Sequence, residues 1–312
     1  RGLGDVYKRQ AKKYGGIYVP VNQAVIHQFA REEMVKCGNM ILGSDSHTRY
    51  GSLGNMGVGE GGGELVKQLL RNTWDINAPE VVLVWLEGTP RHGIGPHDVA
   101  ISLVKAVFES GFVKNKVLEF AGPGVANLSV DFRNGIDVMT TETTCLSSIW
   151  VTDEKVREHY ELHRRPEDYK ELRPGKVAYY DSMVRIDLSK QESMIALPYH
   201  PSNAVSIHEL QADPETVLRR VEEDTKRRFG DKVQPDLVSK IRDGKVYADQ
   251  GIIAGCAGGM YDNIAEAAAI LEGHDVGSGY FSLSVYPSSV PVNLELIHSG
   301  IQQSLLEAGA LF

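Results

Sequence analysis

The hydrophobic positions form short apolar runs that alternate with amphipathic stretches along most of the chain. Three runs, at 81–86, 116–120 and 251–254, are apolar, short and bounded by turn residues, which predicts buried strands. The apolar residues of 98–109 and 264–271 recur at helical spacing and predict amphipathic helices. Strands that alternate with helices are typical of layered α/β domains with largely parallel sheets.

The same alternation continues toward both ends of the chain. Residues 15–21 predict a strand, 24–37 a helix and 39–43 another strand. A highly charged stretch at 214–228 predicts an exposed helix, and residues 292–310 predict one closing amphipathic helix. Further short elements are predicted at 64–73, 152–170, 177–188 and 280–285.

Two stretches rich in Gly, Pro and polar residues, at 88–96 and 198–205, predict domain boundaries. They divide the chain into units at 15–90, 91–200 and 201–312. Each unit contains strands followed by helices, so each is expected to form its own α/β layer structure.

The first ten residues, RGLGDVYKRQ, begin without Met and join poorly to the pattern that follows. They resemble translated sequencing-adapter sequence more than part of a domain. We therefore expect residues 1–14 to be a non-native end, with a genuine polar arm as the alternative.

Composition narrows the class of protein further. The 312 residues carry a net charge of −8, which disfavours nucleic-acid binding and means that local groups must hold any polyanionic substrate. No apolar run reaches the ~20 residues that span a bilayer, so we expect no membrane segment. The three cysteines are far apart and odd in number, which favours a reducing, cytoplasmic setting over a disulfide framework.

The first candidate for chemistry is the segment 43–63, GSDSHTRYGSLGNMGVGEGGG. Asp45 can orient and charge-stabilise His47, which would make His47 a general acid or a ligand of a leaving hydroxyl. The glycines would let backbone N–H groups approach a carboxylate closely. Taken alone, however, a simple turn made by Asp45 and Ser46 is the favoured interpretation.

Gly57, Gly59 and Gly62 also match the G-x-G-x-x-G pattern of dinucleotide-binding proteins, with Glu80 at a tolerable distance for a ribose contact. That pattern requires a strand that runs directly into the first glycine, whereas the predicted strand ends at Leu42. A nucleotide-binding oxidoreductase therefore stays open only as a weak alternative.

Two further residues are candidates. Cys256 occupies a small-residue turn between a strand and a helix, where amides lower a thiol's pKa; the alternative is a buried, inert cysteine. Glu142 is the acid of a Thr-rich segment; the alternative is a residue at a helix start that Thr140 or Thr141 caps. Cys37 and Cys145 show no ligand spacing and are expected in the core.

In this order, four segments resemble the aconitase / isopropylmalate-isomerase family. The Asp-Ser-His-Thr block with its trailing glycines, the segment that ends in Glu142, the turn around Cys256 and the last segment all have counterparts there. The resemblance covers residues 15 to 312 and implies three-layer α/β/α domains of the aconitase type. The four segments are GSDSHTRYGSLGNMGVGEGGG, KVLEFAGPGVANLSVDFRNGIDVMTTET, IIAGCAGGMYDNIAEAAAIL and VYPSSVPVNLELIHSGIQQSLLEAGALF.

The resemblance implies a fragment of an iron–sulfur hydro-lyase that acts on a hydroxy di- or tricarboxylic acid, citrate/isocitrate-like or alkylmalate-like. In the family a four-iron cluster (4Fe–4S) is held by three thiolates and its open iron activates the departing hydroxyl. By resemblance, Asp45 and His47 lie near that hydroxyl and Ser46 contacts a substrate carboxylate. Glu142 holds substrate or water, and Cys256 binds iron.

Several departures indicate an atypical branch of the family. Ala257-Gly258 follows the cysteine in place of Thr-Asn, and Val138 replaces an asparagine. Arg49-Tyr50 replaces Pro-Asn after the Asp-Ser-His-Thr block, which makes Arg49 an alternative anchor for a substrate carboxylate. The family's first histidine falls at Val19, with His27 the nearest histidine.

The family's Cys-x-x-Cys is expected beyond residue 312, and its swivelling domain further on or on a separate subunit. One thiolate cannot hold a four-iron cluster, so we expect these residues alone to retain no stable cluster and to show no turnover. The alternative from another class is a cluster-free regulatory or RNA-binding protein on the same scaffold.

Overall fold

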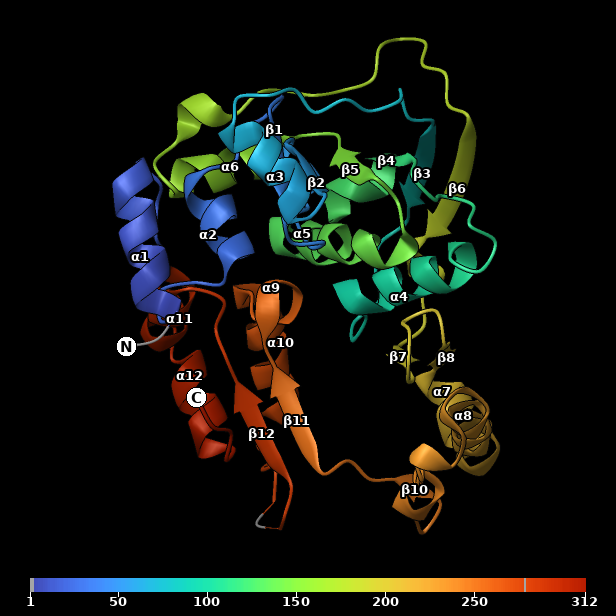
Figure 1. Cartoon of the computed structure of the whole chain (residues 1–312). Coiled ribbons are helices and arrows are strands. Elements are labelled where there is room, and N and C mark those ends of the chain that lie inside the picture. Colours follow the sequence, from blue (N-terminus) through green and yellow to red (C-terminus); the bar gives the residue numbers. More distant parts are fainter. Residues whose placement is uncertain (1–2, 278) are drawn as a thin grey trace.

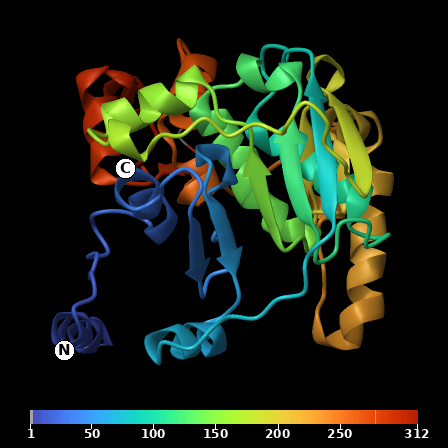
Figure 2. The same cartoon turned by 90° about the horizontal axis from the view of Figure 1, so that it is seen from above.

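The computed structural model describes residues 3–277 and 279–312 and contains a parallel sheet flanked by two smaller units (Figure 1). Seen from above, the C-terminal helices and the long helix α8 (Pro214–Phe229) lie on opposite sides of this sheet (Figure 2). Helix α1 (Leu3–Tyr14), which begins the described chain, lies at one edge of the molecule (Figure 2).

The central sheet contains four parallel strands in the order β5-β4-β3-β6. Their bounds are β3 Val81–Glu87, β4 Val117–Ala121, β5 Ser147–Trp150 and β6 Ser182–Asp187. Alternate residues of β3 point to the core, because successive side chains of a strand lie on opposite faces.

Two helices cover the buried face of this sheet, α4 (Pro96–Val107) and α5 (Val130–Met139). Residues of α4 and α5 form one apolar core with β3, β4 and β5, in which Phe120 and Trp150 stack with their ring centroids 4.1 Å apart. Helix α5 matters for the site because its C-terminal end leads directly to Glu142.

A second apolar core lies under the N-terminal part of the chain. Helices α2 (Ile26–Glu33) and α6 (Glu154–Leu162) contribute to it, and Ile41 of β1 (Met40–Gly43) packs against it. Strand β1 pairs in parallel with β2 (Met56–Gly59). Helix α3 (Gly62–Leu69) follows β2 and buries no residue.

The first of the two smaller units begins with an antiparallel hairpin, β7 (Met194–Ala196) and β8 (Ala204–Ser206), which packs on α4. Helices α7 (Ile207–Ala212) and α8 follow and share a small core with the hairpin. A second short antiparallel pair is formed by β9 (Ile241–Arg242) and β10 (Lys245–Val246).

The C-terminal unit contains one parallel pair, β11 (Gln250–Ile253) and β12 (Ser282–Val285), packed against helices. Its helices are α9 Gly255–Gly258, α10 Tyr261–Leu271, α11 Val290–His298 and α12 Ile301–Glu307. The 3-10 turns of the chain are η1 Gly51–Leu53, η2 Pro123–Asn127, η3 Thr140–Thr143, η4 Pro166–Asp168, η5 Leu188–Lys190, η6 Gly230–Lys232 and η7 Val238–Lys240.

The predicted fold class, a mixed α/β protein with mostly parallel sheets, is confirmed. Two predicted elements are wrong: residues 15–21 form no strand, and 292–310 form two helices because Gly300 adopts a left-handed conformation between them. Strand β3 shares a sheet with strands beyond residue 90, so strand pairing does not favour the boundary expected there. Within the described residues no helix is long and apolar enough to span a bilayer.

Candidate active site

The loop that carries Asp45, Ser46 and His47 turns back tightly between β1 and β2. A Cβ atom on Gly59 would lie 2.2 Å from the carbonyl oxygen of Asp45, and one on Gly57 would lie 2.8 Å from that of Thr48. These glycines therefore make room for the loop. Since both lie inside β2 and not in a loop after it, the structure gives no support to the interpretation of this segment as a dinucleotide-binding loop.

The Asp45 carboxylate organises the loop and its surroundings. Its Oδ1 accepts the backbone N–H of His47 at 2.8 Å and lies 2.9 Å from Nε2 of His27. The other ring nitrogen of His27 lies 3.1 Å from the hydroxyl of Tyr50. With an ionised carboxylate on one side, we assign the His27 proton to Nε2, so that Nδ1 accepts from Tyr50.

His47 lies between two carboxylates. Its Nδ1 is 3.5 Å from Oδ1 of Asp45, and its Nε2 is 3.5 Å from Oε1 of Glu142. The Glu142 carboxylate is the main cause that raises the pKa of His47, and Asp45 adds to the effect. The imidazole is therefore oriented by one acid, and its protonated form is stabilised by both.

Glu142 reaches this position from a short 3-10 turn, η3, that follows the end of α5. Glu142 does lie in the first turn of this short helix, but no side chain caps the helix start. The turn ends at Thr144, which adopts a left-handed conformation with φ 64°. His47 lowers the pKa of Glu142, so the pair favours an ionised Glu142 beside a protonated His47.

Asp45 and His27 lie behind His47, and burial and hydrogen bonding shift the pKa of each in opposite directions. Burial tends to raise the pKa of Asp45, but the His47 N–H and the His27 ring outweigh it, and the net pKa is lowered. Burial lowers the pKa of His27, so this histidine favours its neutral form. A neutral His27 and an ionised Asp45 agree with the proton assignment above.

The remaining residues of the predicted loop differ in exposure. Ser46 is exposed beside His47 at the tip of the loop. Arg49, expected as an anchor for a substrate carboxylate, is buried, and its guanidinium donates to the backbone carbonyls of Thr48, Gly57 and Cys145. In this structure Arg49 therefore fastens the loop to β2 and to the segment before β5.

Cys256 lies in the one-turn helix α9, directly after β11, and is partly buried. Arg31 of α2 is 1% exposed, and its Nη1 donates to the carbonyl oxygen of Cys256 at 2.8 Å. Helix α9 lies beside α2 in Figure 1. A charge-assisted bond thus joins residues 225 positions apart and fixes the turn that carries the thiol.

The pKa of the Cys256 thiol differs from the prediction. Burial raises the pKa of Cys256, although the Arg31 charge and backbone amides oppose this rise. The predicted lowering of this pKa by the turn is therefore wrong, because α9 is only four residues long and desolvation dominates. The Asp45 charge also contributes to raising this pKa, so the loop carboxylate is within electrostatic reach of the thiol.

Sequence reasoning did not select three residues that the structure brings to the site: His27, Arg31 and His200. His27 and Arg31 are four positions apart on α2, so they share one helix face; His27 meets Asp45, and Arg31 meets Cys256. The sequence signal for His27 and Arg31 is that two polar residues lie at positions i and i+4 on a helix face that must be buried.

His200 comes from the loop between β7 and β8, within the stretch expected to be a domain boundary. Its Nε2 lies 3.9 Å from Oε2 of Glu142, on the oxygen that does not face His47. The Glu142 carboxylate is therefore flanked by two histidines from distant parts of the chain.

The thiols of the described residues do not by themselves fit a four-iron cluster. Cys37 and Cys145 are buried in two different apolar cores, as expected, and each donates to a backbone carbonyl, of Leu53 and Thr140 respectively. Across 3–277 and 279–312, no three His, Cys, Asp or Glu side chains lie together in a way that could hold a metal ion. Of the three cysteines, Cys256 is the one that is only partly buried.

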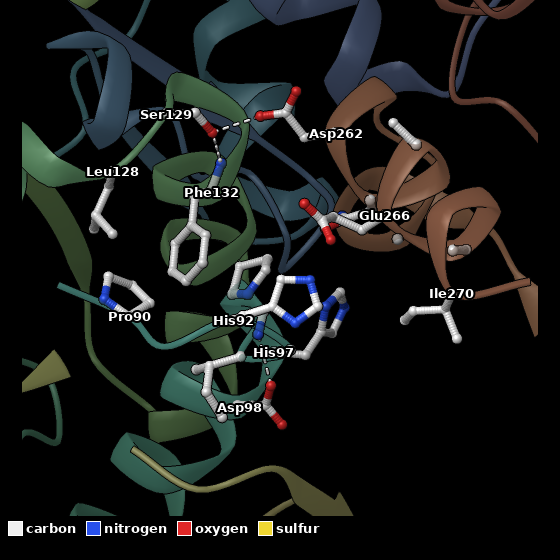
Figure 3. A pocket seen from close by; sticks show the side chains of 18 of the residues that line it. Pro90, His92, His97, Asp98, Leu128, Ser129, Phe132, Asp262, Glu266 and Ile270 are labelled. Atoms are coloured by element: carbon white, nitrogen blue, oxygen red, sulfur yellow. Dashed lines mark hydrogen bonds between the residues drawn. The ribbon is translucent and has the colours of Figure 1, made fainter. Parts of the chain in front are cut away.

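A cavity with a volume of about 870 Å³ lies apart from the acid–base residues. Figure 3 shows His92 of the loop before α4 opposite Glu266 of α10. Ala254 and Gly258, on either side of the Cys256 turn, line this cavity, whereas Asp45, His47 and Glu142 do not. It therefore adjoins the cysteine turn without containing the proposed chemistry.

Asp45, His47 and Glu142 thus form an acid–base cluster on an α/β scaffold, and Cys256 lies on a turn that Arg31 of α2 holds. The chain belongs to the aconitase family (aconitate hydratase), whose profile matches residues 4–312. Members of this family generally bind a 4Fe–4S cluster.

Individual relatives are more distant. The 3-isopropylmalate dehydratase large subunit 1 of Thermotoga maritima is 26% identical over 301 residues, which cover 96% of this chain and 64% of the relative. A 3-isopropylmalate dehydratase large subunit of Archaeoglobus fulgidus is 27% identical, with 96% and 64% covered. The 2,3-dimethylmalate dehydratase large subunit of Eubacterium barkeri is 27% identical, with 89% and 58% covered. The chain thus spans a little less than two thirds of the length of these relatives.

Proposed function

We propose that this chain carries the proton-transfer part of a hydro-lyase that adds or removes water on a hydroxy di- or tricarboxylic acid. The observation that supports it is the position of the His47 imidazole, with Nδ1 facing Asp45 and Nε2 facing Glu142. The family membership and the names of the relatives, which are dehydratases of substituted malates, point to the same class of reaction.

The proposed roles follow from the charges. Cleavage of a C–O bond is slow because hydroxide is a poor leaving group, and a proton delivered to the departing oxygen removes that obstacle. His47 suits this step because Glu142 raises its pKa and so favours its protonated form. Asp45 fixes the His47 ring from the Nδ1 side. Glu142 holds the departing hydroxyl or a water on the Nε2 side.

Substrate carboxylates must be bound locally, because a chain with a net charge of −8 does not attract anions as a whole. The exposed hydroxyl of Ser46 is the proposed contact, next to His47 in the sequence. We do not include Arg49, since its guanidinium already donates to three backbone carbonyls.

We further propose that Cys256 is one thiolate ligand of a 4Fe–4S cluster whose other ligands lie outside the residues described. When bound, such a cluster supplies a Lewis acid for oxygen ligands. The relatives are large subunits by name, so the chain is proposed to act with a further domain of the same polypeptide or with a separate subunit.

The alternatives gain no support. The glycines of the proposed nucleotide loop lie in a strand. For a cluster-free regulatory or RNA-binding role, RNA binding would need a basic patch, and the acidic sequence shows none.

The test compares this chain with the complete polypeptide that contains it, each purified under anaerobic conditions. We expect no stoichiometric iron and no turnover from residues 1–312 alone, and iron-dependent hydration of an unsaturated di- or tricarboxylate by the complete protein. His47→Asn should lower kcat by about 10²–10⁴-fold. Hydration by the complete protein that is unchanged in His47→Asn would remove the proposed acid.

A further inference from the structure

The Glu142 carboxylate has a partner on each oxygen. His47 lies 3.5 Å from Oε1, and His200 lies 3.9 Å from Oε2. We infer that His200 is a positioning residue for Glu142: its Nε2–H directs one carboxylate oxygen and thereby keeps the other aimed at His47. This inference rests on the proposed function of Glu142 in the hydro-lyase reaction.

The hydrogen bonds around His200 determine which ring nitrogen carries the proton. The backbone N–H of Ser202 donates to Nδ1 at 3.1 Å, so Nδ1 must be an acceptor. The Ser202 hydroxyl, 3.0 Å from the same nitrogen, can also donate to it. The neutral imidazole therefore carries its proton on Nε2, the nitrogen that faces Glu142.

The ring is held in this orientation before any substrate binds. It stacks on Phe108, just beyond the end of α4, with centroids 3.8 Å apart and an angle of 24° between the planes. The hairpin β7–β8 that carries His200 packs on α4 as well. Stacking fixes the plane of the ring, and the Ser202 contacts fix its rotation within that plane.

The 3.9 Å separation is too long for a direct hydrogen bond, but a bridging water or a small closure of the hairpin would complete one. His200 also contributes to the lowered pKa of Glu142, after the larger effect of His47. A carboxylate with a partner on each oxygen cannot rotate freely, and orientation of this kind is what a reacting pair requires.

Two substitutions separate positioning from a structural role in the turn. The amide nitrogen of glutamine replaces Nε2, so His200→Gln keeps a donor toward Glu142. The amide oxygen of asparagine replaces Nδ1 as acceptor, so His200→Asn keeps the Ser202 contact but is too short to reach Glu142. Both variants lose the stacking on Phe108, which makes each the control for the other.

In the complete protein we expect His200→Asn to lower kcat by about 10- to 100-fold with little change in KM, and His200→Gln to stay within about 3-fold of the parent. Thermal unfolding of both variants shows whether either has lost its fold. The reverse order, with the asparagine variant active and the glutamine variant impaired, would show that His200 only supports the turn and would overturn the inference.

A second measurement does not depend on turnover. Long-range ¹H–¹⁵N spectra of residues 1–312 should show the Nε2–H tautomer of His200, with a shift of its Nε2 signal in Glu142→Gln. A Nδ1–H tautomer, or no response to that substitution, overturns the link. If residues 1–312 show this response but the complete protein has no hydro-lyase turnover, the proposed function is refuted while the His200–Glu142 contact is supported.

Discussion

Two successive turns of helix α2 face two differently built halves of the candidate site. His27 faces a closed set of proton-transfer groups, in which Asp45, His47 and Glu142 already have partners within 3.5 Å. One turn later Arg31 faces Cys256, where a single thiol is presented on a fixed turn. The acid–base half is closed by contacts among these residues, whereas the cysteine half presents one thiol.

The difference has a physical origin. A loop can place an acid beside a histidine through its own backbone, as the Asp45 carboxylate does with the N–H of His47. A cluster needs several thiolates that converge from separate segments, and the other two cysteines here lie in apolar cores. Local sequence can therefore encode the first half, whereas one thiol on a turn does not make a cluster site by itself.

The largest effect is expected from the glycine that allows the loop to turn back. In Gly59→Ala the new methyl group would collide with the Asp45 carbonyl oxygen, so we expect the free energy of unfolding to fall by about 2–3 kcal/mol. The matched control is Gly63→Ala in α3, where the new methyl group meets nothing within 4 Å and helix propensity improves. Urea unfolding measures both. Equal stability of the two variants would mean that the loop is not packed as described.

A smaller, local effect tests the cysteine half. Arg31→Met removes the bond to the Cys256 carbonyl, and amide exchange in the α9 turn should become about 10-fold faster, as expected for the loss of roughly 1.5 kcal/mol. Arg157→Met, a change at an exposed arginine of α6, is the control and should leave this exchange unaltered. Exchange at α9 that is the same in both variants would show that Arg31 does not hold the turn.

The pairing of His47 with Glu142 predicts a change in proton affinity. The pKa of His47 is raised in the folded protein, so its stabilising effect is present at low pH and is lost as pH rises through that pKa. The pKa of Glu142 is lowered, so its effect is present above its unfolded value and is lost as pH falls. The pair therefore stabilises the fold between these two transitions.

Glu142→Gln should lower the pKa of His47, because the main cause of its rise is removed. An NMR titration of the His47 ring measures this change, and Glu161→Gln on the exposed side of α6 serves as the control. A His47 titration that is the same in both variants would mean that the two side chains do not interact in solution.

Much of the fold was predictable from the sequence, because most of its elements are short and periodic. The alternation that predicted strands at 81–86 and 251–254 corresponds to β3 and β11. The apolar residues at 15–21 misled the prediction, since Ile17 and Val21 are exposed and pair with no sheet. The stretch 292–310 is apolar at helical spacing apart from residues such as Gly300, so the sequence predicted one helix. The left-handed backbone of Gly300 separates α11 from α12 in the structure.

The site was predictable only where one short segment carries it. Asp45 and His47 are neighbours in sequence, so their contact follows from a turn. His200 was hidden in a stretch whose Pro and Asn residues indicated a boundary, and its approach to Glu142 depends on how a hairpin packs on α4. Contacts of this kind depend on tertiary packing, which periodicity does not reveal.

The central claim is that Cys256, and neither other cysteine of this chain, binds iron beside the proton-transfer residues. Iron content after anaerobic reconstitution of the complete protein tests it in three serine variants. Cys37→Ser and Cys145→Ser should keep the cluster, since serine can retain the hydrogen bonds to the Leu53 and Thr140 carbonyls. Cys256→Ser should lose it, and a Cys256→Ser protein with full iron content would contradict the account.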